Sequence, residues 1–500
     1  MSLLAQIGNP DTLLALYAMC WATIAAAARQ RNVNMRHWFD AGVAKRIAIV
    51  SFPLMGTMVG NLLMMLVDRL CLAHYSQDTL AASGPAVFTS MAIIAFFCST
   101  VGVSRSFIAQ ANGRSGLSEA WNEAALGLLL GIACGALLFV AAPLIAMIPQ
   151  LSSRPPQIVS LESQYMLWAA IFGGVMTINT ALSSFFNGVG RTRETLMVGI
   201  VGQVVDSIFT VGLVFGKFGL PEMGMAGAAF GTLIGTLSML TCYAVMLPRK
   251  IWLELMNIFI ARSERLLPRL FFRLRRGVPS GLSAGVDQLG NTAFIWIVAV
   301  LGSSALAANN VNLTINYLGI IPIIGLGIGC SILCATAVGK EQYTELATIL
   351  RVTLTIELLY VLLVSTVQIT LPQVLLKAFG DLGHNPEIVA LAIDTQRVLW
   401  TFSAAFVFSM TGAAVLESIG MARFSLVVRL VLMWFISIPL IYYVAMNNRD
   451  VPSSLMTCWV IGSVFEFLIG AIYFWRIAKA IRGAENRLHV DPHPASKSAL

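Results

Sequence analysis

The sequence predicts an all-α integral membrane protein with twelve transmembrane helices in two six-helix, pseudo-symmetric lobes, preceded by an appended N-terminal helix. Of its 500 residues, 57% are hydrophobic and only 11% are charged, a composition that soluble globular proteins do not have. The apolar residues form long runs rather than alternating strand-like segments, so the spans are expected to be helices. The second half of the chain repeats the first, which predicts the two lobes.

The repeat is clearest between residues 53 and 113. A shift of 226 residues aligns three marks of the first half with the second without a gap: Pro53 with Pro279, Leu80-Ala81-Ala82 with Leu306-Ala307-Ala308, and Gly113 with Gly339. The loop at residues 190–193 has a counterpart at residues 420–423, at a shift of 230. An even number of spans in each half makes the repeats parallel, related by an axis along the membrane normal.

An apolar run at residues 11–27 precedes the duplicated part and is followed by a basic flank at residues 29–36. A signal peptide carries its positive charge in front of the apolar run, so cleavage is not expected. The run is also short for a full span. We therefore predict that residues 1–45 form an appended helix with a basic flank.

The remaining apolar runs predict six spans in an N-lobe at residues 46–247 and six in a C-lobe at residues 277–478. The spans are expected at residues 46–71, 82–107, 121–147, 161–186, 194–215, 224–247, 278–301, 308–335, 348–372, 391–416, 422–445 and 453–477. Most Lys and Arg residues then fall on one side, which the positive-inside rule identifies as the cytoplasm. Both ends of the core, and the polar tail at residues 479–500, are therefore predicted to be cytoplasmic.

Residues 248–276 join the lobes and alternate basic with bulky apolar side chains. Such a basic amphipathic segment can lie on the anionic inner leaflet, so membrane lipids are expected partners. The formal net charge of +8 is explained by cytoplasmic segments of this kind. Nucleic acid is not predicted as a partner.

Two groups of glycines recur at a spacing of four residues: Gly127, Gly131 and Gly135, and Gly227, Gly231 and Gly235. Small residues at this spacing let helix backbones approach closely in a membrane. These glycines predict helix packing rather than chemistry.

Acidic residues inside the predicted spans are the candidate functional residues. Asp206 lies ~18 Å into the fifth span, and Gln203 lies on the same helix face three residues earlier. A carboxylate at that depth must be protonated, paired with another helix or placed in a wet cavity. A purely structural buried hydrogen bond is the alternative interpretation.

Asp68 lies near the outer end of the first span, and Asn61 points to the same side of that helix two turns earlier. An ion pair with the adjacent Arg69 is the alternative for Asp68. Asp287 lies in the seventh span at the position that the repeat equates with Asn61. Each half therefore presents polar groups on one helix face, although a structural role is also open for Asp287.

Buried carboxylates suit coupled export. A carboxyl can gain a proton when its cavity opens to the acidic side of a membrane and lose it on the other side. An anionic site can alternatively hold Na⁺. Glu357 and Glu466 also lie inside predicted spans, but the sequence names no partner for them.

The sequence does not predict an enzyme. It shows no nucleophile and base pair, no metal cluster and no P-loop. Residues 281–285 match the G-x-S-x-G hydrolase motif, but they begin a membrane helix rather than the strand-turn-helix that the motif requires.

Together these features resemble the multidrug and toxic compound extrusion (MATE) family of antiporters, and within it the NorM branch. The marks are Pro53, Val67-Asp68, Leu80-Ala81-Ala82, Asn187-Gly188-Val189-Gly190-Arg191-Thr192-Arg193, the stretch at residues 206–229, Pro279, Asp287 and Leu306-Ala307-Ala308. The resemblance covers residues 45–478.

The resemblance implies a secondary active efflux transporter that exports amphipathic, cationic organic compounds in exchange for H⁺ or Na⁺ by alternating access. It implies a monomer in the bacterial inner membrane, with a small organic molecule as substrate and no cofactor besides the coupling ion. By resemblance, Asp68 and Asp206 correspond to acids linked to proton coupling and drug binding. Asp287 corresponds to a carboxylate linked to cation binding and is the candidate Na⁺ ligand, and Thr232 corresponds to a hydroxyl of the first lobe's network.

Three departures from the family pattern together favour H⁺ over Na⁺, and one of them is the appended N-terminal helix. Gly202 stands where the family usually has Asn, with Gln203 beside it as a substitute. The acid that some NorM-like members carry in the tenth span aligns with Phe408, so a Na⁺ site at Asp287 would lack a ligand. The alternative function is a lipid-linked precursor flippase of the same wider superfamily, whose members tend to carry basic residues in the cleft, whereas the mid-span charges here are read as acidic.

Overall fold

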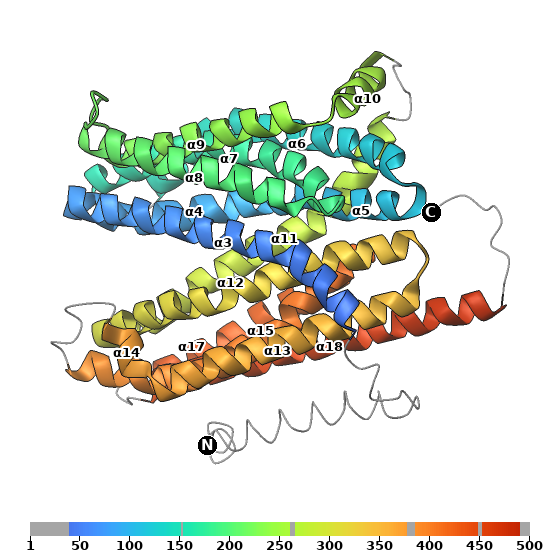
Figure 1. Cartoon of the computed structure of the whole chain (residues 1–500). Coiled ribbons are helices and arrows are strands. Elements are labelled where there is room, and N and C mark those ends of the chain that lie inside the picture. Colours follow the sequence, from blue (N-terminus) through green and yellow to red (C-terminus); the bar gives the residue numbers. More distant parts are fainter. Residues whose placement is uncertain (1–39, 152–153, 261–265, 378–385, 449–452, 491–500) are drawn as a thin grey trace. The chain divides into compact units, whose positions relative to one another are not determined.

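The computed structural model describes residues 40–151, 154–260, 266–377, 386–448 and 453–490 (Figure 1). Every regular element in these residues is a helix, and 11 of the helices are long and apolar enough to cross a membrane. The predicted all-helical membrane fold is confirmed. The appended helix predicted within residues 1–45 lies outside the described residues, apart from residues 40–45.

The seventh predicted span is the least apolar. It lies within α11 (Leu266–Ala299), which carries Asp287, Gln288 and Asn291 in its second half. These polar side chains explain why α11 is not among the 11 helices that meet the hydropathy criterion. With α11, the described residues contain the twelve long helices expected of two six-helix lobes.

The helices form two compact units. The N-unit, residues 49–294 and 420–430, contains most of α3 (Ala41–Tyr75), then α4 (Gln77–Gly102), α5 (Ser104–Ser115), α6 (Leu117–Ala146), a 3-10 turn (Ile148–Leu151), α7 (Pro156–Gly188), α8 (Thr192–Phe215), α9 (Gly224–Met246), α10 (Arg249–Ile260), most of α11 and α16 (Ala422–Arg429). The C-unit, described at residues 40–48, 295–377, 386–419, 431–448 and 453–490, contains α12 (Ser303–Gly339), α13 (Tyr343–Thr370), α14 (Pro372–Lys377), α15 (Pro386–Ser418), all but the first residue of a π-helix (Leu430–Ser437), α17 (Ile438–Asn447) and α18 (Ser454–Val490).

The unit boundaries fall inside α3 and α11 and directly after α16. The sequence repeat assigns residues 277–294 and 420–430 to the C-lobe, whereas they cluster with the N-unit in the structure. A hydrogen bond from Arg276 Nη1 to the Gly420 carbonyl oxygen, 3.3 Å long, is one contact that joins α11 to the start of α16.

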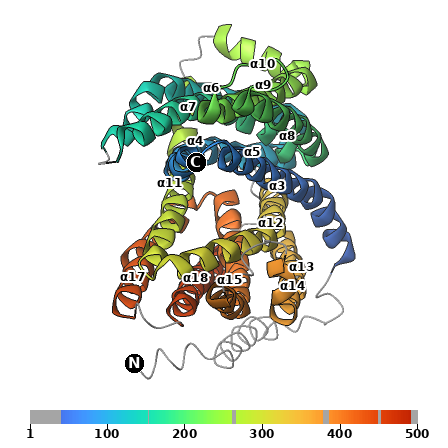
Figure 2. The same ribbon diagram turned by 90° about the vertical axis from the view of Figure 1, so that its left-hand side faces the viewer.

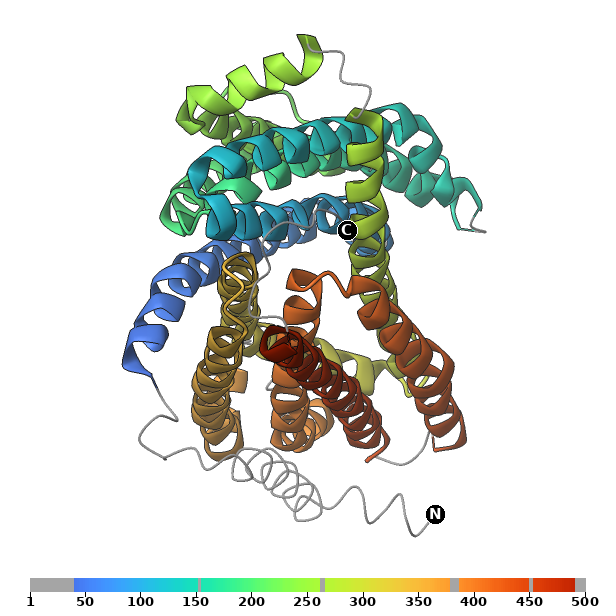
Figure 3. The ribbon, with the colours of Figure 1, turned by 90° about the vertical axis from the view of Figure 1, so that its right-hand side faces the viewer.

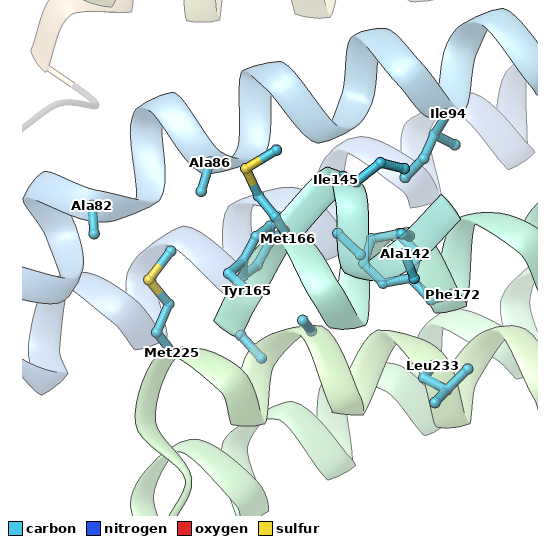
Figure 4. Packing of buried hydrophobic residues seen from close by; sticks show 14 of the residues in the cluster. Ala82, Ala86, Ile94, Ala142, Ile145, Tyr165, Met166, Phe172, Met225 and Leu233 are labelled. Carbon is cyan, nitrogen blue, oxygen red and sulfur yellow. The ribbon is translucent and has the colours of Figure 1, made fainter. Parts of the chain in front are cut away.

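The N-unit is built around α7, which packs against α4, α6 and α9 (Figure 2). Figure 4 shows Tyr165, Met166 and Phe172 of α7 among apolar side chains of those three helices, such as Ile145 and Met225. Burial of large apolar side chains contributes about 1.5–3 kcal/mol each in water. In lipid, however, close packing takes over that role.

The C-unit is built around α15, which packs against α12, α13 and α18 (Figure 3 shows α18 in red). α16 passes without a break into the π-helix at Leu430–Ser437, which continues into α17. A π-helix of eight residues is unusual, because its hydrogen bonds run from i to i+5 and such elements are mostly single turns.

The glycines at a spacing of four residues are packing positions, as predicted. A Cβ atom on Gly231 of α9 would lie 2.4 Å from Thr210 Oγ1 of α8, and one on Gly235 would lie 2.6 Å from Asp206 Cβ. The missing side chains therefore allow α8 to lie directly on α9. This contact places Asp206 against α9.

We expect Gly231→Ala to lower the stability of the detergent-solubilised protein by ~1–3 kcal/mol, because overpacking a tight contact forces the backbones apart. Gly84→Ala is the matched control, since a Cβ atom there meets nothing within 4 Å. Both changes carry the same gain in helix propensity. Thermal unfolding measures the difference, and equal melting temperatures for the two variants would contradict the packing argument.

Candidate functional site

Asp206 is the most deeply buried acid of the N-unit. Its side chain lies on α8, the residue is 1% exposed, and neither carboxyl oxygen has a hydrogen-bond partner in the described residues. An ionised carboxylate in such a place carries a desolvation cost of several kcal/mol. The Asp206 carboxyl must therefore bind a proton and be neutral, or it must pair with a cation from outside the described residues.

Two further residues of the predicted site, Asp68 and Thr232, lie near this carboxyl, together with Thr210, which was not predicted. Asp68 of α3 lies close enough to Asp206 for the two charges to interact, and its Oδ1 atom is also buried without a partner. Thr232 of α9 lies beside Asp206, and Thr210 of α8 lies beside Asp68. The structure thus brings two acids and two hydroxyls together from three helices.

The side chain of Tyr165 extends this cluster to α7, because both aspartates act on it electrostatically. The sequence offered no signal for Tyr165, since an aromatic residue in a span is normally packing. The ion pair considered between Asp68 and Arg69 does not form in the described residues. Arg69 instead lies over the ring of Phe88, with its Cζ atom 5.7 Å from the ring centroid.

Asn61 and Gln203 connect α3 to α8 on one side of the aspartates. Gln203 Nε2 donates a 3.0 Å hydrogen bond to Asn61 Oδ1 and a longer one, 3.4 Å, to the Thr57 carbonyl oxygen. Gly60 makes room for this amide, because a Cβ atom at that position would overlap Gln203 Oε1. Asp68 lies two turns after Asn61 on the same face of α3, and Asp206 lies one turn after Gln203 on the same face of α8. Both aspartates therefore lie along the same contact between α3 and α8.

Asp287 differs from Asp68 and Asp206 because it has a cationic partner among the described residues. Its Oδ1 atom is 3.3 Å from Nε of Arg429, the last residue of α16. The Arg429 side chain is 7% exposed and that of Asp287 is 36% exposed. A guanidinium already neutralises this carboxylate, so a Na⁺ ion would have to displace it.

Arg429 corrects the sequence analysis, which described the mid-span charges as acidic. The sequence did carry a signal for this pair. Arg429 is the eighth residue of the predicted span at 422–445, where an arginine is costly unless an acid pairs with it. The described residues also contain no group of three or more His, Cys, Asp or Glu side chains that could hold a metal ion.

We expect the two members of this pair to respond unequally to neutralisation. Asp287→Asn removes the carboxylate that lies 3.3 Å from the buried guanidinium of Arg429 and should cost ~3 kcal/mol of stability, whereas Arg429→Gln leaves a partly solvated carboxylate and should cost less. The double variant should be more stable than Asp287→Asn alone. Thermal unfolding of the three variants measures these differences, and strictly additive losses would show that the pair is not coupled.

Solved structures share this fold. A crystal structure of the Vibrio cholerae MATE transporter VcmN in the bent form matches with a TM-score of 0.77 and 16% identity, and the match covers 89% of this chain and 98% of that one. A MATE in complex with MaL6 matches with a TM-score of 0.75 and 19% identity over 89% and 97% of the two chains. The chain therefore has the fold of these MATE structures.

The family can be stated more closely. The family model named MatE matches residues 53–211 and 279–444, and the chain belongs to the MatE family. The probable multidrug resistance protein NorM of Thermotoga maritima is 22% identical over 407 residues, which are 80% of this chain and 85% of that protein. The probable multidrug resistance protein NorM of Pseudomonas putida is 24% identical over 406 residues, which are 79% and 86% of the two chains. The predicted family and its NorM-like branch are confirmed.

Proposed function

We propose that this protein is a secondary active exporter of small amphipathic organic cations, driven by protons that enter in exchange, and that Asp68 and Asp206 bind both the proton and the substrate. The observation that carries the proposal is the pair of membrane-buried aspartates without a cationic partner among the described residues. Relatives named multidrug resistance proteins support efflux of organic compounds.

The two aspartates account for exchange in a simple way. Two negative charges held close together in a buried site repel each other, so the site favours either a cation or added protons. A proton that arrives from the acidic side cancels the charge that holds the organic cation and releases it. Loss of that proton on the other side restores the charge, and the site can load again.

Two observations at the positions linked to Na⁺ binding support H⁺ rather than Na⁺ as the coupling ion. Arg429 already occupies its carboxylate. Phe408, at the position where some relatives carry an acid, packs edge to face on Phe467 and Phe474, with ring centroids 5.9 and 5.8 Å apart. That position is therefore part of an aromatic cluster with no oxygen ligand to offer.

We further propose a monomer in the bacterial inner membrane, with both ends of the helical core in the cytoplasm and α10 on the lipid surface. α10 buries Ile251 and Leu255, and it packs on α6. Its Lys250 lies 4.3 Å from the ring centroid of Trp121, while Trp252 remains partly exposed. A basic amphipathic helix of this kind is suited to anionic headgroups.

The test is uptake of ethidium into inverted membrane vesicles that contain the full chain. An acidic vesicle interior should drive uptake, and an imposed Na⁺ gradient alone should not. Uptake driven only by Na⁺ would overturn proton coupling. No uptake under either gradient would overturn a cationic substrate and direct the search to neutral or lipid-linked cargo.

A further inference from the structure

The C-unit contains a buried carboxyl that the proposed transport site does not use. Glu357 lies in the middle of α13 and is 0% exposed. Thr411 of α15 lies with its Oγ1 atom 2.8 Å from one carboxyl oxygen and 2.9 Å from the other. A Cβ atom on Gly327 of α12 would lie only 3.5 Å from that hydroxyl, so three helices meet at this carboxyl.

No charge compensates Glu357 in the part of the chain that the structure describes. The titratable group that acts on it electrostatically is the thiol of Cys330 on α12, which lies 3.8 Å from Cys334. α15 contributes the neutral Thr411. A single hydroxyl cannot balance a buried negative charge. We therefore expect this carboxyl to be neutral and protonated.

We call the line along which α12, α13 and α15 meet the seam. One helical turn from Glu357, a belt of apolar side chains closes this seam. It is formed by Ile323 of α12, Val361 of α13 and Val407 of α15, which pack in one cluster and are 0%, 5% and 0% exposed. Val361 follows Glu357 by one turn, and Val407 precedes Thr411 by one turn. The belt therefore separates the Glu357 carboxyl from the polar side chains that lie farther along the seam.

Beyond the belt, the seam is polar. Ser403 of α15 donates a 3.0 Å hydrogen bond to Asn316 of α12, and Asn312 donates to the Ala392 carbonyl oxygen at 3.2 Å. Gln368 of α13 lies within 4.0 Å of the position that a Cβ atom on Gly319 would take. These polar side chains come from the same three helices as the belt.

Several polar atoms in this part of the seam have no protein partner in the described residues. They are both side-chain atoms of Gln368 and of Gln396, the Asn312 Oδ1 atom and the Ser365 Oγ atom. The four residues are no more than 6% exposed. Buried polar groups are normally bonded to protein or to ordered water. Since the described protein supplies no partner, the seam is expected to hold water.

We propose that Glu357 is a proton-binding site of the C-unit, which exchanges its proton with water in the polar seam when the Ile323, Val361 and Val407 belt loosens. In the exchange, a hydronium O–H bond breaks as the carboxylate O–H bond forms, and water remains. The reverse step releases the proton. As a second route for coupling protons the site rests on the proposed function, but proton exchange at Glu357 can be measured without transport.

The test is infrared spectroscopy of the purified full chain in liposomes during transfer from H2O to D2O. The wild-type spectrum minus that of Glu357→Gln should contain the C=O stretching band of one protonated carboxyl, and this band should shift as the proton exchanges for deuterium. Glu387→Gln, which changes an exposed glutamate of α15, should keep the band. Repeating the series in Asp206→Asn protein separates this result from the fate of the proposed transport site.

Val407→Thr provides a second, independent readout. It keeps the shape of the side chain but adds a hydroxyl to the belt, so the band should shift faster in D2O. A band that never shifts would make Glu357 a purely structural carboxyl and overturn the proposal. So would a C=O spectrum that Glu357→Gln leaves unchanged, or an exchange rate that Val407→Thr leaves unchanged.

Discussion

Asp206→Asn is expected to reduce proton-driven uptake of ethidium to the background of vesicles without the protein. The amide has the shape of the carboxyl, but it carries no charge and does not bind a proton near neutral pH. The loss of a contact to an ionised group should also weaken binding of the organic cation by tenfold or more, since such contacts contribute ~1.5–3 kcal/mol. Uptake under a pH gradient and equilibrium binding measure the two effects.

Asp394→Asn is the matched control for this experiment. The Asp394 side chain is 58% exposed and lies 3.7 Å from Arg397 on the same helix, so its neutralisation should leave uptake unchanged. The Asp206→Asn protein should also unfold at the wild-type temperature or above it, because the amide is neutral without taking up a proton or a cation. Wild-type uptake by Asp206→Asn would place the coupling site elsewhere and refute the assignment.

Glu123→Ala is expected to cause the largest loss of stability among single substitutions considered for this protein, ~3–5 kcal/mol. Glu123 of α6 accepts a hydrogen bond from Arg273 of α11, whose side chain is only 4% exposed. Arg273 Nη1 also donates to the Glu123 carbonyl oxygen at 3.1 Å, and the guanidinium lies over the ring of Phe107. Burial lowers the pKa of Arg273 and the charge of Glu123 opposes this, so Glu123→Ala leaves a buried cation without the carboxylate that compensates its charge.

A second ion pair at the start of α6 supplies the comparison. Glu119 lies 3.7 Å from Arg114, and their side chains are 33% and 65% exposed. Solvent-exposed pairs of this kind contribute about 0–1 kcal/mol, so Glu119→Ala should hardly change the melting temperature. If Glu119→Ala and Glu123→Ala unfolded at the same temperature, burial of Arg273 would not be what stabilises the contact between α6 and α11.

The sequence predicted those features of the site that depend on spacing along one helix. Asn61 and Asp68 share a face of α3, and Gln203 and Asp206 share a face of α8, because 3.6 residues make one turn. The long apolar runs and the internal repeat likewise predicted the helices and their number. These features follow from local periodicity, which one chain displays.

The pairings between helices could not be predicted in the same way. Arg429 pairs with Asp287 from 142 positions away, and Thr411 lies 54 positions from Glu357. Neither separation has a period that a helix would impose. Such contacts depend on how whole helices pack, which is also why the clustering of the first part of α11 with the N-unit was not foreseen from the repeat.

The π-helix at Leu430–Ser437 bears on how many substrate molecules one chain binds. At the repeat shift of 230 residues, Asp206 corresponds to Ile436, which lies within this π-helix, and Gln203 corresponds to Met433. The wider turn also changes the angle at which successive side chains leave the helix. Duplication therefore did not give this molecule two equivalent carboxylate sites. A titration of substrate against protein should saturate at one organic cation per chain, although the chain is built from two copies of the same plan.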